Sequence, residues 1–175
     1  ALTEGFVEYL NRKIVVSKHY NFEYFIVDLL ISIYGEDILK YPLTNDIVGF
    51  YNDKRFFDIT SLVYYLDLCL IYTSDIQLFI DCSKIILDKE LNEKKKKQQI
   101  KSNLKHINKS LLELSKNIIK CLDIIINDYD RCVNPKIDQY QFHLKVDEFM
   151  KKQDPIINLL EYKNYDINIQ EYFLT

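Results

Sequence analysis

The sequence contains little glycine, proline or arginine, with three residues of each among 175, and it has no tryptophan. The turns of β-sandwiches and β-barrels depend on glycine and proline, so their scarcity argues against these folds. The glycines stand alone at Gly5, Gly35 and Gly49, which excludes the glycine-rich phosphate loops of common nucleotide-binding proteins.

Alanine is almost absent too, whereas isoleucine and lysine, which have AT-rich codons, number 24 and 20. This bias predicts an AT-rich genome, such as that of a virus or another pathogen. The one alanine, Ala1, is interpreted as a cloning remnant.

The overall composition is that of a folded protein, with 48% hydrophobic and 28% charged residues. A chain of this length is expected to form one domain over residues 1–175. Its net charge of −3 gives no overall attraction to nucleic acid or to anionic membranes. The longest apolar run, Ile59 to Tyr72, contains Asp67 and is shorter than the about 20 residues of a spanning helix. It predicts a buried helix and no membrane span.

The four cysteines are Cys69, Cys82, Cys121 and Cys132, which lie in or beside apolar segments without a CxxC pair. No histidine stands at ligand spacing from them, so we expect neither a metal site nor a cofactor. Free thiols in a reducing compartment are the preferred interpretation. No signal peptide is recognisable, which favours a cytoplasmic or host-cell interior location; secretion after removal of a signal peptide is the alternative.

Helical spacing of apolar residues dominates the chain and predicts a single compact all-α bundle of six to eight helices. The almost entirely apolar segment 22–34 is expected at its centre. A short extended C-terminal tail is expected after residue 164. The helices are expected at, in chain order, 4–14, 22–34, 45–51, 60–72, from Ser74, about 100–132, 137–150 and from Asp154-Pro155.

The strongest pattern is a heptad seam, in which apolar residues recur at alternating intervals of four and three. It comprises Ile100, Leu104, Ile107, Leu111, Leu114, Ile118, Cys121 and Ile125. It predicts one long central helix, whose apolar face widens toward its C-terminal end as in a helix that enters a core. The sequence leaves open whether the seam is core or interface. The candidate partner-binding residues are its first five members: Ile100, Leu104, Ile107, Leu111 and Leu114.

A basic segment runs from Lys84 to Lys120 and carries 11 lysines against four acids. Its centre, 92–99, is predicted to be a polar loop or an exposed helical bridge. The segment contains no arginine and no aromatic residue, which disfavours phosphate recognition and base stacking. A solvated face is therefore preferred over an acidic protein partner, and nucleic acid comes last. The candidate electrostatic patch is Lys94, Lys95, Lys96, Lys97, Lys101, Lys105 and Lys109.

Arg12 and His19 have the spacing Arg-x6-His, which resembles the Arg-x4–6-His signature of the all-helical HEPN ribonucleases. The resemblance implies a metal-independent ribonuclease in which His19 activates the region of the ribose 2′-hydroxyl and Arg12 steadies phosphate charge. It covers two residues near the N-terminus, whereas the family's motif lies late in its bundle. A polar helix end that leads into a turn is the preferred interpretation.

Since no catalytic motif remains, the sequence predicts a non-enzymatic interaction or regulatory module, such as an adaptor, inhibitor or immunity-type protein. Such a module acts through a helical face or hydrophobic groove on another protein, which belongs to the host if the source is a pathogen. Two alternatives stay open: a nucleic-acid-binding protein that uses Lys84 to Lys120, and a HEPN-like ribonuclease that uses Arg12 and His19.

Overall fold

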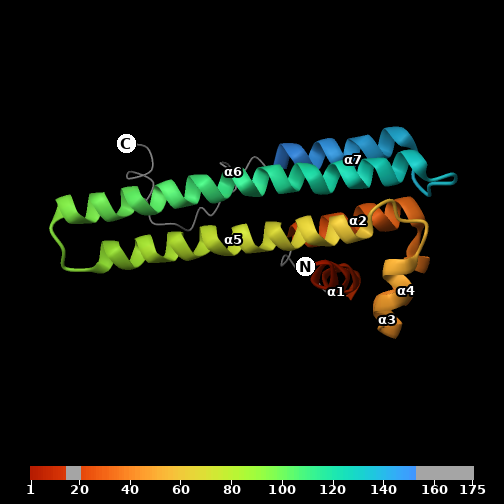
Figure 1. Cartoon of the computed structure of the whole chain (residues 1–175), viewed down its shortest axis with the longest axis horizontal. Coiled ribbons are helices and arrows are strands. Elements are labelled where there is room, and N and C mark those ends of the chain that lie inside the picture. The colour runs from red at the N-terminus through yellow and green to blue at the C-terminus, as the bar shows by residue number, and fades with distance from the viewer. Residues whose placement is uncertain (15–20, 153–175) are drawn as a thin grey trace. The chain divides into compact units, whose positions relative to one another are not determined.

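The computed structural model describes residues 1–14 and 21–152 as helices and connecting turns, which confirms the predicted all-α class (Figure 1). Seven α-helices and one 3-10 helix occur in these two ranges. The helix expected from Asp154-Pro155 and the extended tail after residue 164 lie outside the described residues. The elements are α1 (Leu2–Ile14), α2 (Asn21–Tyr34), η1 (Glu36–Leu39), α3 (Lys40–Thr44), α4 (Ile47–Asn52), α5 (Ile59–Asp88), α6 (Glu93–Arg131) and α7 (Gln139–Lys152).

The contacts divide the chain into two compact units. Among the described residues, unit 1 comprises 1–14, 21–67 and 117–151, and unit 2 comprises 68–116 and Lys152. The three boundaries between the units fall within helices α5 and α6 and at the last residue of α7. The single domain over 1–175 stays a prediction.

Helix α5 differs from the predicted pair of helices. A break was expected between Tyr72 and Ser74, but α5 continues through both residues to Asp88. The hydroxyl of Thr73 donates a hydrogen bond to the carbonyl of Cys69 (2.8 Å). A hydroxyl that donates to the carbonyl four residues earlier has its hydrogen bond within the helix. The polar residues Thr73 and Ser74 therefore do not end α5.

Helix α6 begins earlier than predicted, at Glu93 instead of residue 100. Asn92 acts as its N-cap, because its side-chain oxygen accepts a hydrogen bond from the Lys95 backbone N–H (2.9 Å). Residues 93–99 therefore form exposed first turns of α6, which is the helical one of the two predicted alternatives for this segment.

Helix α2 lies at the centre of unit 1, as predicted. Its residues Ile26, Leu30 and Ile33 are completely buried. Helix α1 approaches α2 closely at Gly5, where an added Cβ would lie 2.4 Å from the carbonyl oxygen of Glu23. On another side of α2, the ring of Phe149 from α7 stacks on Phe25, with 3.8 Å between ring centroids.

Unit 2 contains an antiparallel pair of helices, formed by α5 from residue 68 and α6 up to residue 116 and joined by a turn at 89–92 (Figure 1). Its core consists of Ile76, Ile80 and Ile107, with Phe79, Leu111 and Leu114 packed against them. The ring of Phe79 also stacks on His106, with centroids 4.7 Å apart.

All eight residues of the heptad seam are buried or half-buried in the unit to which they belong. In unit 2, Ile100 and Ile107 are buried, while Leu104, Leu111 and Leu114 are half-buried. In unit 1, the later seam members Ile118, Cys121 and Ile125 are buried as well. A partner would reach Ile100 and Ile107 only if the helix pair opened.

Replacement of Ile107 by aspartate tests this assignment against a matched change on the same helix. Ile107→Asp puts an unpaired charge into the unit 2 core and is expected to lower the free energy of unfolding by about 3–5 kcal/mol. Leu112→Asp changes an exposed side chain and should cost less than about 1 kcal/mol. Urea unfolding followed by circular dichroism measures both values. Similar costs for the two variants would contradict a buried seam.

Candidate functional site

Helix α5 carries apolar side chains on two faces within unit 2. Its inner face, with Ile76 and Ile80, packs on α6. Ile71, Leu78 and Ile85 lie two turns apart from one another on the opposite face, which we call the α5 outer face. Their exposed fractions are 54%, 57% and 56%. A two-helix pair covers one face of each helix, so these three aliphatic side chains stay in solvent.

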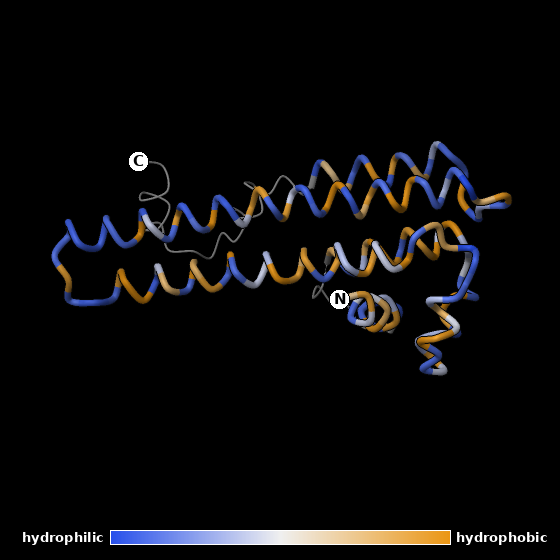
Figure 2. The backbone as a smooth tube through the Cα atoms, in the orientation of Figure 1, coloured by the Kyte–Doolittle hydropathy of each residue, from blue (hydrophilic) through white to orange (hydrophobic). Residues whose placement is uncertain are grey.

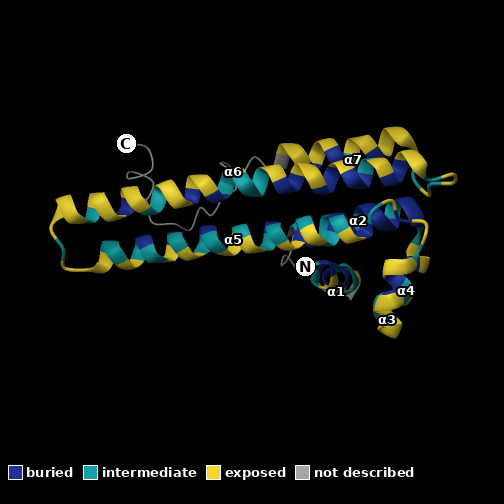
Figure 3. Cartoon of the chain, in the orientation of Figure 1, coloured by how far each residue is buried: buried dark blue, intermediate teal, exposed yellow. Residues whose placement is uncertain are grey.

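The two faces of α5 are evident in the hydropathy and burial of the chain. Hydrophobic segments recur along α5 (Figure 2), and exposed positions recur between buried and half-buried ones on the same helix (Figure 3). Half-buried Leu68 and Cys82 flank the α5 outer face. Together with Ile71, Leu78 and Ile85, they occupy five of six positions with the alternating spacing of three and four that is typical of a helix-packing seam, and Asp75 occupies the sixth.

Aspartates border this apolar face. Asp81 and Asp88 are exposed on one edge, and half-buried Asp75 lies within the seam spacing. The side chain of Asp81 accepts a hydrogen bond from Gln77 (3.0 Å) and lies 3.5 Å from the ammonium of Lys84. The α5 outer face is therefore apolar along its centre and acidic along its edge.

Within residues 1–14 and 21–152, α5 is the one helix with the length and composition needed to cross a membrane, and 22% of its most apolar stretch is buried. This candidate is weak, because its most apolar stretch contains two aspartates, Asp67 and Asp75, and a single such helix also occurs in soluble proteins. A charged side chain within the bilayer costs about 2.5–3.5 kcal/mol or more. The finding agrees with the expected absence of a membrane span.

The predicted lysine patch has two parts in the structure. The ammonium of Lys96 donates a hydrogen bond to the carbonyl of Leu87 (2.9 Å) and so neutralises the C-terminal end of α5. Lys94, Lys95, Lys97, Lys101, Lys105 and Lys109 are exposed. The α6 lysine stripe, which we define as Lys97, Lys101, Lys105 and Lys109, winds around α6. At about 100° per residue it runs from about 60° from the seam at Lys97 to about 180° at Lys109.

The candidate partner-binding residues, Ile100, Leu104, Ile107, Leu111 and Leu114, are buried or half-buried on the side of α6 that packs on α5. Their partner-binding role stays a prediction, whereas the α5 outer face was missed. One signal was present in the sequence: α5 has more apolar residues than one face can hold. The sequence analysis predicted burial for the run from Ile59 to Tyr72 and assigned no role to Leu78 and Ile85.

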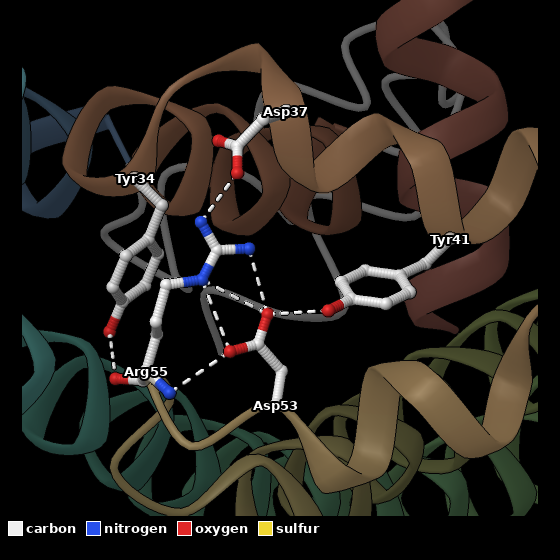
Figure 4. A network of polar contacts seen from close by, with 5 residues as sticks. All are labelled: Tyr34, Asp37, Tyr41, Asp53 and Arg55. Atoms are coloured by element: carbon white, nitrogen blue, oxygen red, sulfur yellow. Dashed lines mark hydrogen bonds and ion pairs between the residues drawn. The ribbon is translucent and has the colours of Figure 1, made fainter.

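A polar cluster in unit 1 joins the segment after α4 to η1 and α3 (Figure 4). The Arg55 guanidinium pairs with Asp53 (2.7 Å) and with Asp37 (2.5 Å), and the Tyr41 hydroxyl donates to Asp53 (2.6 Å). Burial alone would raise the pKa of Asp53, but the hydrogen bonds from Arg55 and Tyr41 outweigh it and lower that pKa to about 2. Asp53 is thus ionised and occupied by its neighbours, which suits a structural role better than proton transfer.

A second buried carboxylate lies near the end of α6. Asp128 is 2% exposed, and its Oδ1 accepts hydrogen bonds from the Tyr34 hydroxyl (2.8 Å) and from the Phe57 backbone N–H. Burial raises the pKa of Asp128, although both hydrogen bonds act in the opposite direction. The Tyr34 oxygen also lies 2.9 Å from the Arg55 carbonyl. Asp128 therefore ties α2 and the segment before α5 to α6.

Of the two residues in the ribonuclease resemblance, the structure describes Arg12 but not His19. Arg12 lies on α1, where its Nε donates to Glu8 (2.8 Å) and its guanidinium lies 3.9 Å from the ring centroid of Tyr24. His19 lies outside the described residues. Across the described ranges, no group of three or more histidine, cysteine or acidic side chains is arranged to hold a metal ion, and no disulfide joins the four cysteines.

Comparisons with known proteins give no relative for this chain: no family model, no curated protein and no solved structure matches it. The α5 outer face is therefore judged on its own geometry.

Asp53→Asn is expected to reduce the loss of unfolding free energy that the wild-type protein shows as the pH falls below about 4. Because folding lowers the pKa of Asp53 to about 2, its stabilising contribution is complete above about pH 4 and is lost as the pH falls toward 2. Since Arg55 is partly exposed, we expect the loss to be only about 1 kcal/mol. Urea unfolding at several pH values measures it. Tyr41→Phe, which removes one hydrogen bond, should give a smaller change in the same direction, and parallel profiles for Asp53→Asn and wild type would contradict the assignment.

Asp128→Ala and Asp128→Asn should separate the hydrogen-bonding role of this residue from its charge. The alanine variant leaves Tyr34 and the Phe57 N–H without their acceptor and should lower the free energy of unfolding by about 2–3 kcal/mol at pH 7. The asparagine variant keeps an acceptor oxygen and removes a buried charge, so its stability should stay within about 1 kcal/mol of wild type. Equal losses in chemical denaturation would show that the charge itself is required.

Proposed function

We propose that the protein is a non-enzymatic interaction module that binds a partner protein on the α5 outer face. The observation that carries the proposal is the exposure of Ile71, Leu78 and Ile85 at regular two-turn spacing on a helix whose other face is packed. Contiguous exposed apolar patches are uncommon on monomeric proteins and often mark interaction sites. An adaptor, an inhibitor and an immunity-type protein would each use such a face.

The polar clusters of unit 1 support a binding function over catalysis. Asp53 accepts hydrogen bonds from Arg55 and Tyr41, and Asp128 accepts them from Tyr34 and the Phe57 N–H. The Tyr34 hydroxyl is a poor nucleophile, because burial and the neighbouring Asp128 raise its pKa above the usual value. Both clusters are explained as hydrogen bonds and ion pairs that fix the turns of unit 1.

Binding of a polyanion by the α6 lysine stripe is the weaker alternative. The stripe supplies positive charge to solvent, but the basic segment has no arginine for bidentate phosphate contacts. It also has no aromatic side chain on which a base could stack. The α5 outer face has apolar side chains that a partner could bury, in addition to charged side chains. We therefore prefer it to the α6 lysine stripe as the binding surface.

The proposal predicts that partner binding depends on Leu78. A photo-crosslinking amino acid at position 78 of the full chain, expressed in its native cells, should give a discrete adduct with one protein, which mass spectrometry identifies. Leu78→Glu should then weaken the purified complex by about 1.5–3 kcal/mol, the value of burying one aliphatic side chain. Isothermal titration measures that change.

Val48→Glu is the matched control, because Val48 is an exposed aliphatic residue of α4 in unit 1. It should leave the affinity unchanged, and the circular dichroism of both variants should match wild type. Equal adducts from positions 48 and 78 would contradict the proposal. So would tight, salt-sensitive binding of generic RNA that Lys101→Gln and Lys105→Gln abolish while Leu78→Glu preserves it.

A further inference from the structure

The charge pattern around the α5 outer face identifies the kind of partner that fits it; this step rests on the proposed function. Asp81 and Asp88 are exposed beside Leu78 and Ile85, and Asp75 lies in the seam between Ile71 and Leu78. Between residues 68 and 88 the sequence has three aspartates and one basic residue, Lys84. Lys84 lies near Asp81, at 3.5 Å, so this part of α5 carries a net charge of −2 beside its apolar face.

We propose that the occupant of the α5 outer face is an amphipathic helix of another protein, with apolar residues at heptad spacing and lysine or arginine beside them. The seam spacing of Leu68, Ile71, Leu78, Cys82 and Ile85 fits the a and d positions of a packed helix pair. In such pairs the residues next to the seam select partners by charge. Acidic flanks on α5 therefore select basic flanks on the incoming helix.

A second copy of the α5 outer face is a poor occupant. If two copies of α5 cross antiparallel at Leu78, Asp75 of one copy lies at the level of Asp81 of the other. In a parallel pair, Asp75, which occupies a seam position, meets Asp75 of the other copy. Like charges that face each other across a helix pair are destabilising. The α6 lysine stripe of a second copy has the right charge, but Leu112 is the one large apolar side chain exposed on α6 within 93–116.

Two other occupants have the wrong charge. The segment 153–175 contains four acids and one lysine in the sequence, which gives it the same sign as the α5 outer face. An anionic membrane would likewise be repelled by Asp75, Asp81 and Asp88. Of the lysines in unit 2, Lys84 lies on this part of α5 and is counted in its net charge. Lys101, Lys105 and Lys109 of the α6 lysine stripe lie about 100–180° around α6 from the seam that packs on α5.

The test uses the full chain and two synthetic helical peptides of about three heptads. Both have leucine at the a and d positions; one has lysine at the flanking positions and the other has glutamate. Fluorescence anisotropy at low salt should show at least about tenfold tighter binding of the lysine peptide, a preference that shrinks at high salt. Asp81→Lys combined with Asp88→Lys should abolish or reverse the preference, and Leu78→Gln should weaken binding of the lysine peptide by at least about fivefold.

The outcomes separate the occupant from the surface. If both peptides bind equally and Leu78→Gln weakens both, the charge rule is overturned while the α5 outer face remains the binding surface. If neither peptide binds, the helical occupant is overturned, and the crosslinking result at position 78 decides the proposed function independently. Dimerisation in sedimentation that Leu78→Gln abolishes would assign the face to a second copy. Binding to phosphatidylserine vesicles that depends on Leu78 would assign it to a membrane.

Discussion

The central constraint on this protein is that a pair of helices can bury only one face of each. In unit 2, α6 meets this constraint, because its seam residue Ile107 is buried and its lysines other than Lys96 are exposed. Helix α5 does not, because Ile76 and Ile80 use the inner face while Ile71, Leu78 and Ile85 remain outside. The asymmetry between the two helices is the source of the proposed binding surface.

Unit 1 satisfies its own polar groups in a different way. Its central helix α2 is fully buried at several positions, and the turns around it are fixed by paired charges and by a buried carboxylate. Asp53 and Arg55 neutralise each other within a short segment, while Asp128 accepts hydrogen bonds from two other elements. Polar groups that are paired in this way hold the turns of unit 1 in place.

Much of the fold could be predicted from the sequence, because apolar spacing reports directly on helical faces. The all-α class, the central position of the 22–34 segment and the long helix around the heptad seam are all confirmed. The continuity of α5 could not be predicted from Thr73 and Ser74, because a hydroxyl that bonds within the helix has the same sequence signature as a helix cap. The hydrogen bond from Lys96 to the Leu87 carbonyl could not be predicted either, because in the sequence Lys96 is one of four consecutive lysines.

The exposed position of the α5 outer face was the hardest feature to predict, since an apolar helix in a sequence looks the same whether two helices or five surround it. Hydroxyl-radical footprinting of the dilute full chain, with residue-level mass spectrometry, measures that exposure directly. Ile71, Leu78 and Ile85 are expected to be oxidised much faster than Ile76, Ile80 and Ile107. Protection of Ile71, Leu78 and Ile85 equal to that of Ile76 and Ile80 in the monomer would contradict an open binding face on α5.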